Sequence, residues 1–358
     1  MIFQNSIVRF IAFFIPVKNI RESFILTNSR KTKYAKLRED NKRLFIENKS
    51  LLKEVNRLSV ENIEIKQSLQ RIENILKGYN LAGGPESPHR ATVYLSVLCI
   101  SKNEGSYLKE WIEYHKLVGV ERFYFYDNDS SDNTKEVLEP YIKAGNVIYH
   151  EISGNSQQFP AYRDCIRKYA RETRWLAIID IDEFIVPIEK ESISNFLKDY
   201  EKYPAVGINW VNFDSNGHET KPSEHGGLVI ANYTRIRSES KDSLKGNQHI
   251  KSIVNPKDVI TIDSPHYAVY MGGTGAVTEN FDTVYGAFTN IHSSSKIQIN
   301  HYYTKSREEY IQKCQKGRAS SNLSKDFSES HLNFKNPIND LAIQKYLPRL
   351  KKAMGIND

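Results

Sequence analysis

The sequence predicts an α/β protein in which a mostly parallel sheet, flanked by helices, follows an N-terminal parallel coiled coil. From about residue 94 to 184, apolar strand-like segments alternate with amphipathic helical ones. This alternation is typical of a parallel sheet covered on both faces. Residues 37–76 repeat Leu or Ile at every seventh position, which is the pattern of a coiled coil.

We divide the 358 residues into five predicted parts. In chain order they are a basic, amphipathic membrane-associating segment at 1–33, a coiled-coil stalk at 34–78, a linker at 79–92, the sheet domain at 93–320, and a C-terminal loop and helix at 321–358.

The N-terminal segment holds most of the net charge of +7, with seven Lys or Arg against one Glu in residues 1–36. The apolar run from Ile2 to Ile15 is interrupted by Arg9 and is too short to span a bilayer. It predicts a helix lying on an anionic membrane surface, with packing on the protein's own core as the alternative. Because the basic excess is confined to this apolar end, the composition argues against a nucleic-acid binder.

The stalk carries two sets of heptad positions. The first is Leu37, Leu44, Leu51, Leu58, Ile65 and Ile72, and the second is Asn41, Asn48, Val55, Asn62, Leu69 and Leu76. Asn in the seam fixes register at a cost in stability, which favours a parallel homodimer, with a trimer as the alternative. Three scattered cysteines indicate free thiols in a reducing compartment. Together these features predict a cytoplasmic protein, peripheral on the inner face of the cell membrane.

The sheet domain begins with four predicted strands joined by three helices. The strands are Tyr94–Ile100, Arg122–Asp127, Asn146–Ile152 and Trp175–Ile179, and the helices are Gly105–Leu117, Asp132–Lys143 and Phe159–Thr173. A further helix is predicted at Ile338–Met354.

Polar side chains cluster where these strands end. They are Asn103 and Glu104, Asp127 and Asn128, and Asp180 and Asp182. Two carboxylates at the carboxyl end of a strand repel each other unless a cation lies between them. Ligands bind at that edge of open α/β sheets, so a metal carrying a phosphorylated ligand is the first hypothesis. The alternative is that these residues only shape turns and cap the following helices.

The motifs in their order resemble glycosyltransferase family 92 and its bacterial relatives. They are Ser101–Glu104, Tyr107–His115, Gly119, Phe125–Asn128, Ser130, Asp132, Ala161–Cys165, Asp180–Phe184, Asn300–Ser306, Glu308–Tyr310, Lys313 and Lys316–Ala319. The resemblance implies a GT-A (Rossmann-like) fold for 93–320 and a nucleotide-sugar donor, UDP-galactose or another UDP-hexose. It also implies Mn2+ (or Mg2+) and inversion at the anomeric carbon.

The resemblance also implies residue roles. Asp180, Asp182 and His301 are the expected metal ligands. The expected donor-binding residues are Asn103, Glu104, Asp127, Asn128, Arg163, Asp180, Lys305 and Arg318. An inverting transfer needs a general base; Asp214, His218 and Asp263 are candidates, and none of them is assigned.

The predicted function is therefore sugar transfer to a glycan or lipid-linked acceptor in bacterial surface-polysaccharide synthesis. A first alternative is a membrane-tethered scaffold that binds a nucleotide sugar without catalysis. A second is a haloacid-dehalogenase-like phosphatase, which also places two Asp after a strand but needs a hydroxyl where Phe184 stands.

Overall fold

A computed structural model describes residues 36–55, 57–59, 62, 65–66, 91–237, 246–316 and 327–356. The chain forms two compact units, Met1–Pro85 and Glu86–Asp358. The predicted membrane-associating segment and Arg318 lie outside the described residues.

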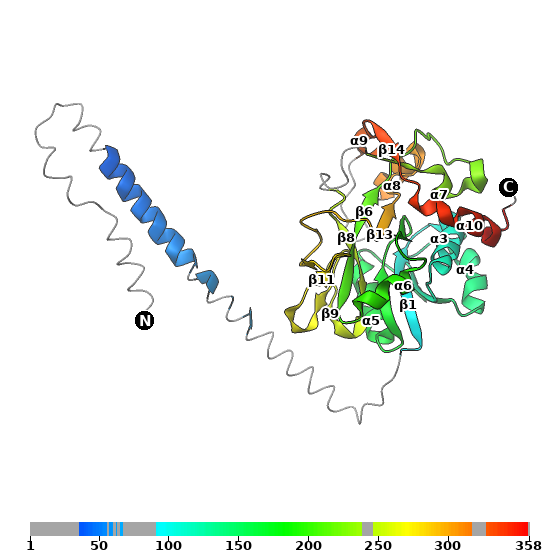
Figure 1. The fold of residues 1–358 in the computed structure, drawn as a ribbon, viewed down its shortest axis with the longest axis horizontal. Helices are drawn as coiled ribbons and strands as arrows, with labels where there is room; N and C mark the ends of the chain where they lie inside the picture. Colours follow the sequence, from blue (N-terminus) through cyan, green and yellow to red (C-terminus); the bar gives the residue numbers. More distant parts are fainter. Residues whose placement is uncertain are drawn as a thin grey trace, which may run out of the picture. The chain divides into compact units, whose positions relative to one another are not determined.

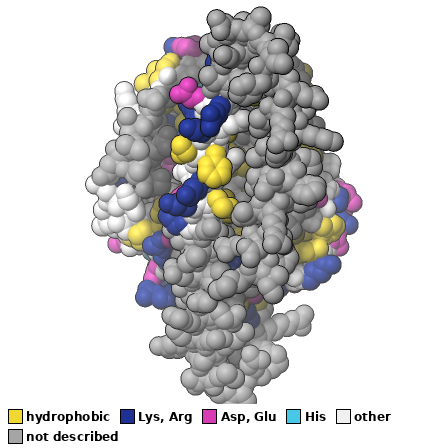
Figure 2. All heavy atoms as spheres, turned by 90° about the vertical axis from the view of Figure 1, so that its left-hand side faces the viewer, with side chains coloured by type: hydrophobic (Ala, Val, Ile, Leu, Met, Phe, Trp, Pro, Cys, Tyr) yellow, Lys and Arg dark blue, Asp and Glu magenta, His cyan; other side chains and the backbone are white. Residues whose placement is uncertain are grey.

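In the first unit, residues 36–55 and 57–59 are helical. The heptad residues Leu37, Leu44 and Leu51 are between 54% and 59% exposed. A single chain therefore leaves the apolar stripe uncovered, and its pairing with a second chain stays a prediction. Hydrophobic side chains lie among Lys and Arg side chains on the face shown in Figure 2. Over the part of the chain that the structure describes, no helix is long and apolar enough to cross a membrane.

The second unit is built on a ten-stranded mixed sheet (Figure 1). Its strands are β1 (Val93–Ser101), β2 (Arg122–Asp127), β3 (Val147–Glu151), β4 (Thr173–Ile178), β5 (Glu183–Pro187), β6 (Ala205–Asn212), β8 (Ile250–Val254), β11 (Ala276–Val277), β12 (Thr283–Val284) and β13 (Ile297–His301). The run β3-β2-β1-β4 is parallel. β8 is antiparallel to both β4 and β6, while β13 lies parallel to β6 and antiparallel to β5.

Two short sheets and several helices complete the described part of this unit. β7 (Arg235–Arg237) pairs with β14 (Pro337–Asn339), and β9 (Val259–Thr261) pairs with β10 (Val269–Tyr270). The α-helices of the described part are α3 (Gly105–Leu117), α4 (Thr134–Lys143), α5 (Gln158–Tyr169), α6 (Ile193–Leu197), α7 (Val229–Asn232), α8 (Arg307–Lys316), α9 (Glu329–Leu332) and α10 (Leu347–Met354).

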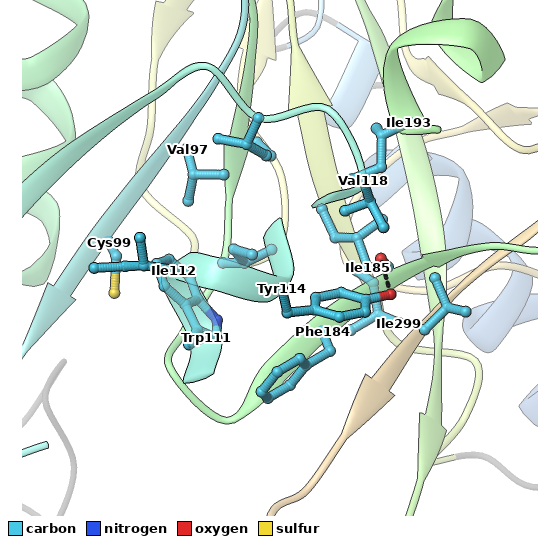
Figure 3. Packing of buried hydrophobic residues seen from close by; sticks show 14 of the residues in the cluster. Val97, Cys99, Trp111, Ile112, Tyr114, Val118, Phe184, Ile185, Ile193 and Ile299 are labelled. Atoms are coloured by element: carbon cyan, nitrogen blue, oxygen red, sulfur yellow. Dashed lines mark hydrogen bonds between the residues drawn. The ribbon is translucent and has the colours of Figure 1, made fainter. Parts of the chain in front are cut away.

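The alternation of side chains along β1 divides the core between the two faces of the sheet. Val97 and Cys99 belong to the larger apolar cluster, which α3, α4 and α10 cover, whereas Leu98 and Ile100 belong to the cluster against α5. In Figure 3, Tyr114 of α3 lies against β5 and its hydroxyl donates to the Ile185 carbonyl at 3.0 Å. The sheet is therefore covered on both faces, as the alternating pattern predicts.

Most predicted elements match the structure to within two residues at each end, and two differ by more. The predictions for β2 and α3 are confirmed with the same bounds. α5 ends at Tyr169 because Thr173 belongs to β4, where its hydroxyl bonds Ser96 Oγ at 2.9 Å. The predicted helix from Ile338 is wrong at its start, because Ile338 lies in β14. A 3-10 helix at Ala342–Tyr346 then leads into α10, which begins at Leu347 with a proline in its first turn.

A buried carboxylate connects α3 to the start of α7. Glu110 is 4% exposed and accepts hydrogen bonds from the backbone N–H groups of Val229 at 2.8 Å and Ile230 at 3.0 Å. These N–H groups open a helical turn and have no partner within it. Glu110 therefore fixes the segment before β7 to the face of the sheet that α3 covers.

We expect Glu110→Gln to lower the free energy of unfolding by about 1–3 kcal/mol, because one buried N–H loses its acceptor. Burial raises the pKa of Glu110 to about 7, from an unfolded value of 4.5, against the pull of the two N–H groups. The folded state keeps the proton of Glu110 more tightly than the unfolded state does. The resulting gain in the free energy of unfolding is complete at pH values below 4.5 and is lost as pH rises through 7. Urea unfolding at several pH values should show that the free energy of unfolding of the wild type exceeds that of Glu110→Gln by more at low pH than at high pH. Glu136→Gln, on the exposed face of α4, is the control and should change stability by less than about 0.5 kcal/mol.

Candidate active site

The ends of three parallel strands bring the predicted polar residues to one edge of the main sheet. β1 lies between β2 and β4 and is parallel to both. The loops after β1 and β2 are joined, because the Asn103 N–H donates to Ser130 Oγ at 2.9 Å and Asn103 Oδ1 accepts from the Ser131 N–H at 2.7 Å. After β4 the chain passes through Asp180 and Asp182 and turns directly into β5.

The two polar residues that end β2 are held by internal hydrogen bonds. Asp127 is buried, and its oxygens accept from the Ser130 N–H at 3.0 Å and the Tyr149 hydroxyl at 2.7 Å. The Asn128 amide donates to the Gly154 carbonyl at 2.9 Å. These contacts shape the loops, as the capping alternative expects. A role for either residue in binding a nucleotide stays a prediction.

Asp180 is held by a lysine on a neighbouring strand. Lys251 of β8 is 1% exposed, and its ammonium lies 2.8 Å from Asp180 Oδ2 and 3.3 Å from Glu183 Oε2. Burial disfavours this ammonium, but the two carboxylates outweigh burial and raise the pKa of Lys251 well above its usual value. The charge of Asp180 is thus balanced within the protein.

Asp182 and His301 meet because β13 runs antiparallel to β5. His301 lies opposite Glu183 in this pairing, and the Tyr302 N–H donates to the Asp182 carbonyl at 2.8 Å. His301 Nε2 lies 3.8 Å from Asp182 Oδ2. The other ring nitrogen, Nδ1, donates to Asn212 Oδ1 at 2.8 Å, so the Nε2 lone pair is left on the side of Asp182.

The protonation states of this pair suit a metal. Burial lowers the pKa of His301 to about 3, although Asp182 opposes the shift. Burial disfavours the Asp182 carboxylate, but the Lys313 ammonium bound to it outweighs burial and lowers the pKa of Asp182. A neutral imidazole and an ionised carboxylate are the forms that bind a divalent ion.

The described residues offer two metal ligands rather than a closed cage. No group of three His, Cys, Asp or Glu among them is placed to hold an ion. A lysine holds one oxygen of each aspartate, Lys251 on Asp180 Oδ2 and Lys313 on Asp182 Oδ2, so the part of Asp180 as a ligand stays a prediction, and Asp182 and His301 are the two that face each other. Magnesium-type ions commonly bind one or two protein ligands and complete their shell with substrate phosphates and water. The pair therefore fits a metal that binds together with a phosphorylated ligand.

Two further lysines meet at the ring of Tyr107, and the charge of one of them, Lys305, helps to lower the pKa of Asp182. Lys305 is 9% exposed, its ammonium lies 3.7 Å from Glu104 Oε2, and it stands 3.5 Å from the centre of the Tyr107 ring. The Lys221 ammonium contacts the same ring at 4.1 Å. Burial lowers the pKa of both lysines, and nearby carboxylates oppose the shift. The loop 217–224 that carries Lys221 lines a cavity of about 320 Å³. Two partly desolvated ammonium groups on one ring favour a bound anion.

The three candidate bases have different surroundings. Asp214 is buried, pairs with Arg235 through Oδ1 at 3.0 Å, and accepts from the Phe334 N–H through Oδ2 at 3.0 Å. These are the contacts of a residue that fixes a loop. His218 lines the cavity beside Lys221, and its Nε2 lies 3.3 Å from the Asn232 carbonyl.

Asp263 and Arg163 form an ion pair with each other, and both side chains are more than half exposed. Sequence reasoning expected Arg163 to bind the donor and Asp263 to be a candidate base. The structure brings them together at the surface. Both roles stay predictions.

Sequence reasoning assigned no site role to Lys221, Lys313, Asn212 or Glu183, although Lys313 and Glu183 stand in the family motifs. Lys313 lies in an ordinary polar helix, α8, and Asn212 ends an apolar strand. The pairing of Lys251 with Asp180 was not predicted either. A lysine within the buried strand β8 was the available signal, because lysine is almost never fully buried without a partner.

Comparison with known proteins places these motifs in a family. The profile of Glycosyltransferase family 92 matches residues 96–353. The chain is 35% identical over 112 residues to the galactan beta-1,4-galactosyltransferase GALS3 of Arabidopsis thaliana, a match that covers 28% of this chain and 22% of the relative. It is 30% identical over 114 residues to a glycosyltransferase family 92 protein of Oryza sativa subsp. japonica, which covers 32% and 20%. The chain thus matches about a fifth of the length of each relative.

Solved structures show lower similarity. The crystal structure of S. aureus TarS 1-349 has a TM-score of 0.33 and 15% identity, over 61% of this chain and 62% of that chain. The mannosyltransferase PcManGT from Pyrobaculum calidifontis in complex with GDP-Man and Mn2+ has a TM-score of 0.28 and 13% identity, over 38% and 42%.

The family match begins in β1, contains every residue of the site described above, and ends in α10. The prediction made from the motifs is confirmed: the chain belongs to glycosyltransferase family 92.

Proposed function

We propose that this chain is a metal-dependent, inverting glycosyltransferase of the GT-A fold. It moves a sugar from a nucleotide sugar, UDP-galactose or another UDP-hexose, to a glycan or lipid-linked acceptor. The observation that carries the proposal is the Asp182–His301 pair beside Lys305 and Lys313, at the carboxyl edge of parallel strands. Family membership and the name of the Arabidopsis thaliana relative support a galactosyl donor.

The residues divide the work of donor binding. Asp182 and His301 would hold a divalent ion, which supplies positive charge to the leaving diphosphate. Lys305 and Lys221 offer ammonium groups to the phosphate oxygens, and the Tyr107 ring keeps both close. Asn212 fixes the orientation of the His301 ring. Among the candidate bases, His218 lines the cavity, whereas both oxygens of Asp214 are engaged, so His218 is the first to test.

The alternatives predict different behaviour. A phosphatase of the haloacid-dehalogenase type lacks its hydroxyl here, because Phe184 stands at that position and is buried in the core. A non-catalytic scaffold would bind the donor and release no sugar. Hydrolysis or transfer of the donor with added Mn2+ separates the scaffold from the enzyme.

We expect Asp182→Asn to abolish the metal dependence of UDP binding. Calorimetry of the full chain with and without Mn2+ should show tighter wild-type binding with the ion. The variant should lose at least tenfold in affinity with Mn2+, about 1.4 kcal/mol. Asp199→Asn, an exposed carboxylate away from the site, is the control. A folded wild-type protein that binds no nucleotide would contradict the transferase proposal.

We expect Lys221→Met to weaken UDP more than UMP, because the lysine is proposed to contact the diphosphate. Methionine keeps an apolar chain over Tyr107 and removes the charge. The loss for UDP should be about tenfold, in line with one charge-assisted hydrogen bond. Lys202→Met is a matched control, since Lys202 also stands over a tyrosine ring, Tyr203 at 5.1 Å, and is exposed. Equal losses for UDP and UMP would rule out a diphosphate contact.

We further propose that residues 34–78 pair with a second copy of the chain in a parallel coiled coil, and that residues 1–33 bind an anionic membrane surface. The uncovered heptad stripe supports the first proposal. Two weak membrane contacts held at one end of a dimer would reinforce each other. The location on the inner face of a cell membrane, and a part in bacterial surface-polysaccharide synthesis, stay predictions.

We expect the double variant Leu44→Asp/Leu51→Asp to sediment as a monomer while the wild type sediments as a dimer, because the charges would be buried in the seam. Ile46→Asp introduces the same charge on the same helix outside both sets of heptad positions, and it should leave the dimer intact. A monomeric wild type at micromolar concentration would refute the coiled coil.

A further inference from the structure

We propose that His266 is the general base of the transfer, and that its Nε2 takes the proton of the acceptor hydroxyl as that oxygen bonds to the anomeric carbon. The inference rests on the proposed function and names the base, which the proposed function leaves unassigned. His266 was not among the three predicted candidate bases.

His266 lies at the edge of the main sheet that carries the proposed metal ligands. β8 runs antiparallel to β4 and β6, so its first residue, Ile250, lies at the edge where those two strands end. The Ile250 carbonyl holds His266 Nδ1 at 3.0 Å. The His266 ring packs edge-on to Trp210 with ring centres 5.2 Å apart, and the Trp210 ring centre lies 4.2 Å from that of His301. One aromatic ring therefore separates His266 from the proposed metal ligand His301.

The proposed diphosphate contacts lie on the other side of the metal ligands. An inverting transfer needs its base on the face of the sugar opposite the leaving group. In the sheet, β4, which leads to Asp182, lies between β1 and β8. Lys305 lies beside Glu104, which follows β1, whereas His266 is held at the start of β8. His266 and the diphosphate contacts are thus placed on opposite sides of Asp182.

The three predicted candidate bases have contacts that suit the role less well. Both oxygens of Asp214 are engaged, and Asp263 is paired with Arg163. His218 shares its loop with Lys221, which is proposed to contact the diphosphate, so it lies on the side of the leaving group. These contacts favour His266 over all three.

The hydrogen bond to Ile250 decides which nitrogen of His266 can accept a proton. A carbonyl oxygen only accepts, so Nδ1 carries the hydrogen and Nε2 of the neutral ring carries the lone pair. Burial lowers the pKa of His266 to about 4, and the Lys251 ammonium adds to the shift, so the ring is neutral at pH 7. Carboxylates of similar pKa are the bases of inverting glycosidases. A base of this strength is sufficient because a hydroxyl that bonds to an anomeric carbon becomes strongly acidic.

The proposed step is a single displacement. The acceptor oxygen bonds to the anomeric carbon while the bond from that carbon to the diphosphate oxygen breaks, and the electron pair of the broken bond leaves with UDP. The acceptor proton passes to His266 Nε2, and the imidazolium then releases it to water.

The test compares two nucleophiles, water and azide, that attack UDP-galactose or UDP-glucose on the full chain with Mn2+. Water must give up a proton as it attacks, whereas the azide ion has no proton and needs no base. His266→Asn should slow hydrolysis of the donor about a hundredfold and change the formation of glycosyl azide by less than about twofold. The asparagine amide can still donate to the Ile250 carbonyl, so the affinity for UDP with Mn2+ should not change.

The matched control is His150→Gln on the end strand β3. His150 also stacks on an aromatic ring, Tyr126 at 4.6 Å, and its Nε2 is held by the Tyr169 hydroxyl at 2.8 Å. The glutamine amide reaches the position of Nε2, and neither reaction should change.

The outcomes separate the base from the proposed function. A wild type that consumes no UDP-hexose with either nucleophile refutes the proposed function. A wild type that reacts with azide but not with water refutes the base alone. A His266→Asn variant that keeps hydrolysis, or that loses both reactions equally as a structural defect would cause, also refutes the base alone.

Discussion

The ammonium of Lys251 lies between the carboxylates of Asp180 and Glu183, and the turn that carries the candidate site depends on this contact. The turn between β4 and β5 holds three carboxylates in four residues, and Glu183 is completely buried. Burial raises the pKa of Glu183 to about 8 although Lys251 opposes the shift, so the ammonium chiefly balances the charge of Asp180. Removing one partner of such a buried pair typically costs about 3–5 kcal/mol. The strand pairing that brings His301 beside Asp182 starts from this same turn.

The rest of the site repeats this arrangement, with each acidic group close to a lysine from another element. Asp182 contacts Lys313 of α8, and Glu104 lies beside Lys305. The partners of each pair are distant in sequence, so they keep their positions only when the sheet, α8 and the loop after β13 are assembled. The charges that a nucleotide diphosphate would meet are therefore in place before it binds, which limits the ordering cost of binding.

Local patterns in the sequence were enough to predict the first half of the sheet domain. Apolar periodicity gave β2 and α3 with the observed bounds, and the parallel order of β1, β2 and β4 brings the polar strand ends to one edge, as expected. The pattern failed where a short element depends on distant partners. Ile338 reads as helical but pairs with β7 instead. The pairs that Lys251 and Lys313 form with Asp180 and Asp182 could not be predicted either, because each pair joins segments far apart in the chain.

The contact between Lys313 and Asp182 has a consequence for ion selectivity. A metal ion that binds Asp182 through Oδ2 would displace the Lys313 ammonium, which also donates to the Tyr303 carbonyl at 2.9 Å. The exchange favours an ion whose charge exceeds that of the lysine. Sodium and potassium carry the same charge as the lysine ammonium but are not attached to the protein, so they would bind Asp182 little better than Lys313 does. The Lys313 ammonium would therefore disfavour binding of monovalent ions at Asp182 and make the site selective for divalent ions.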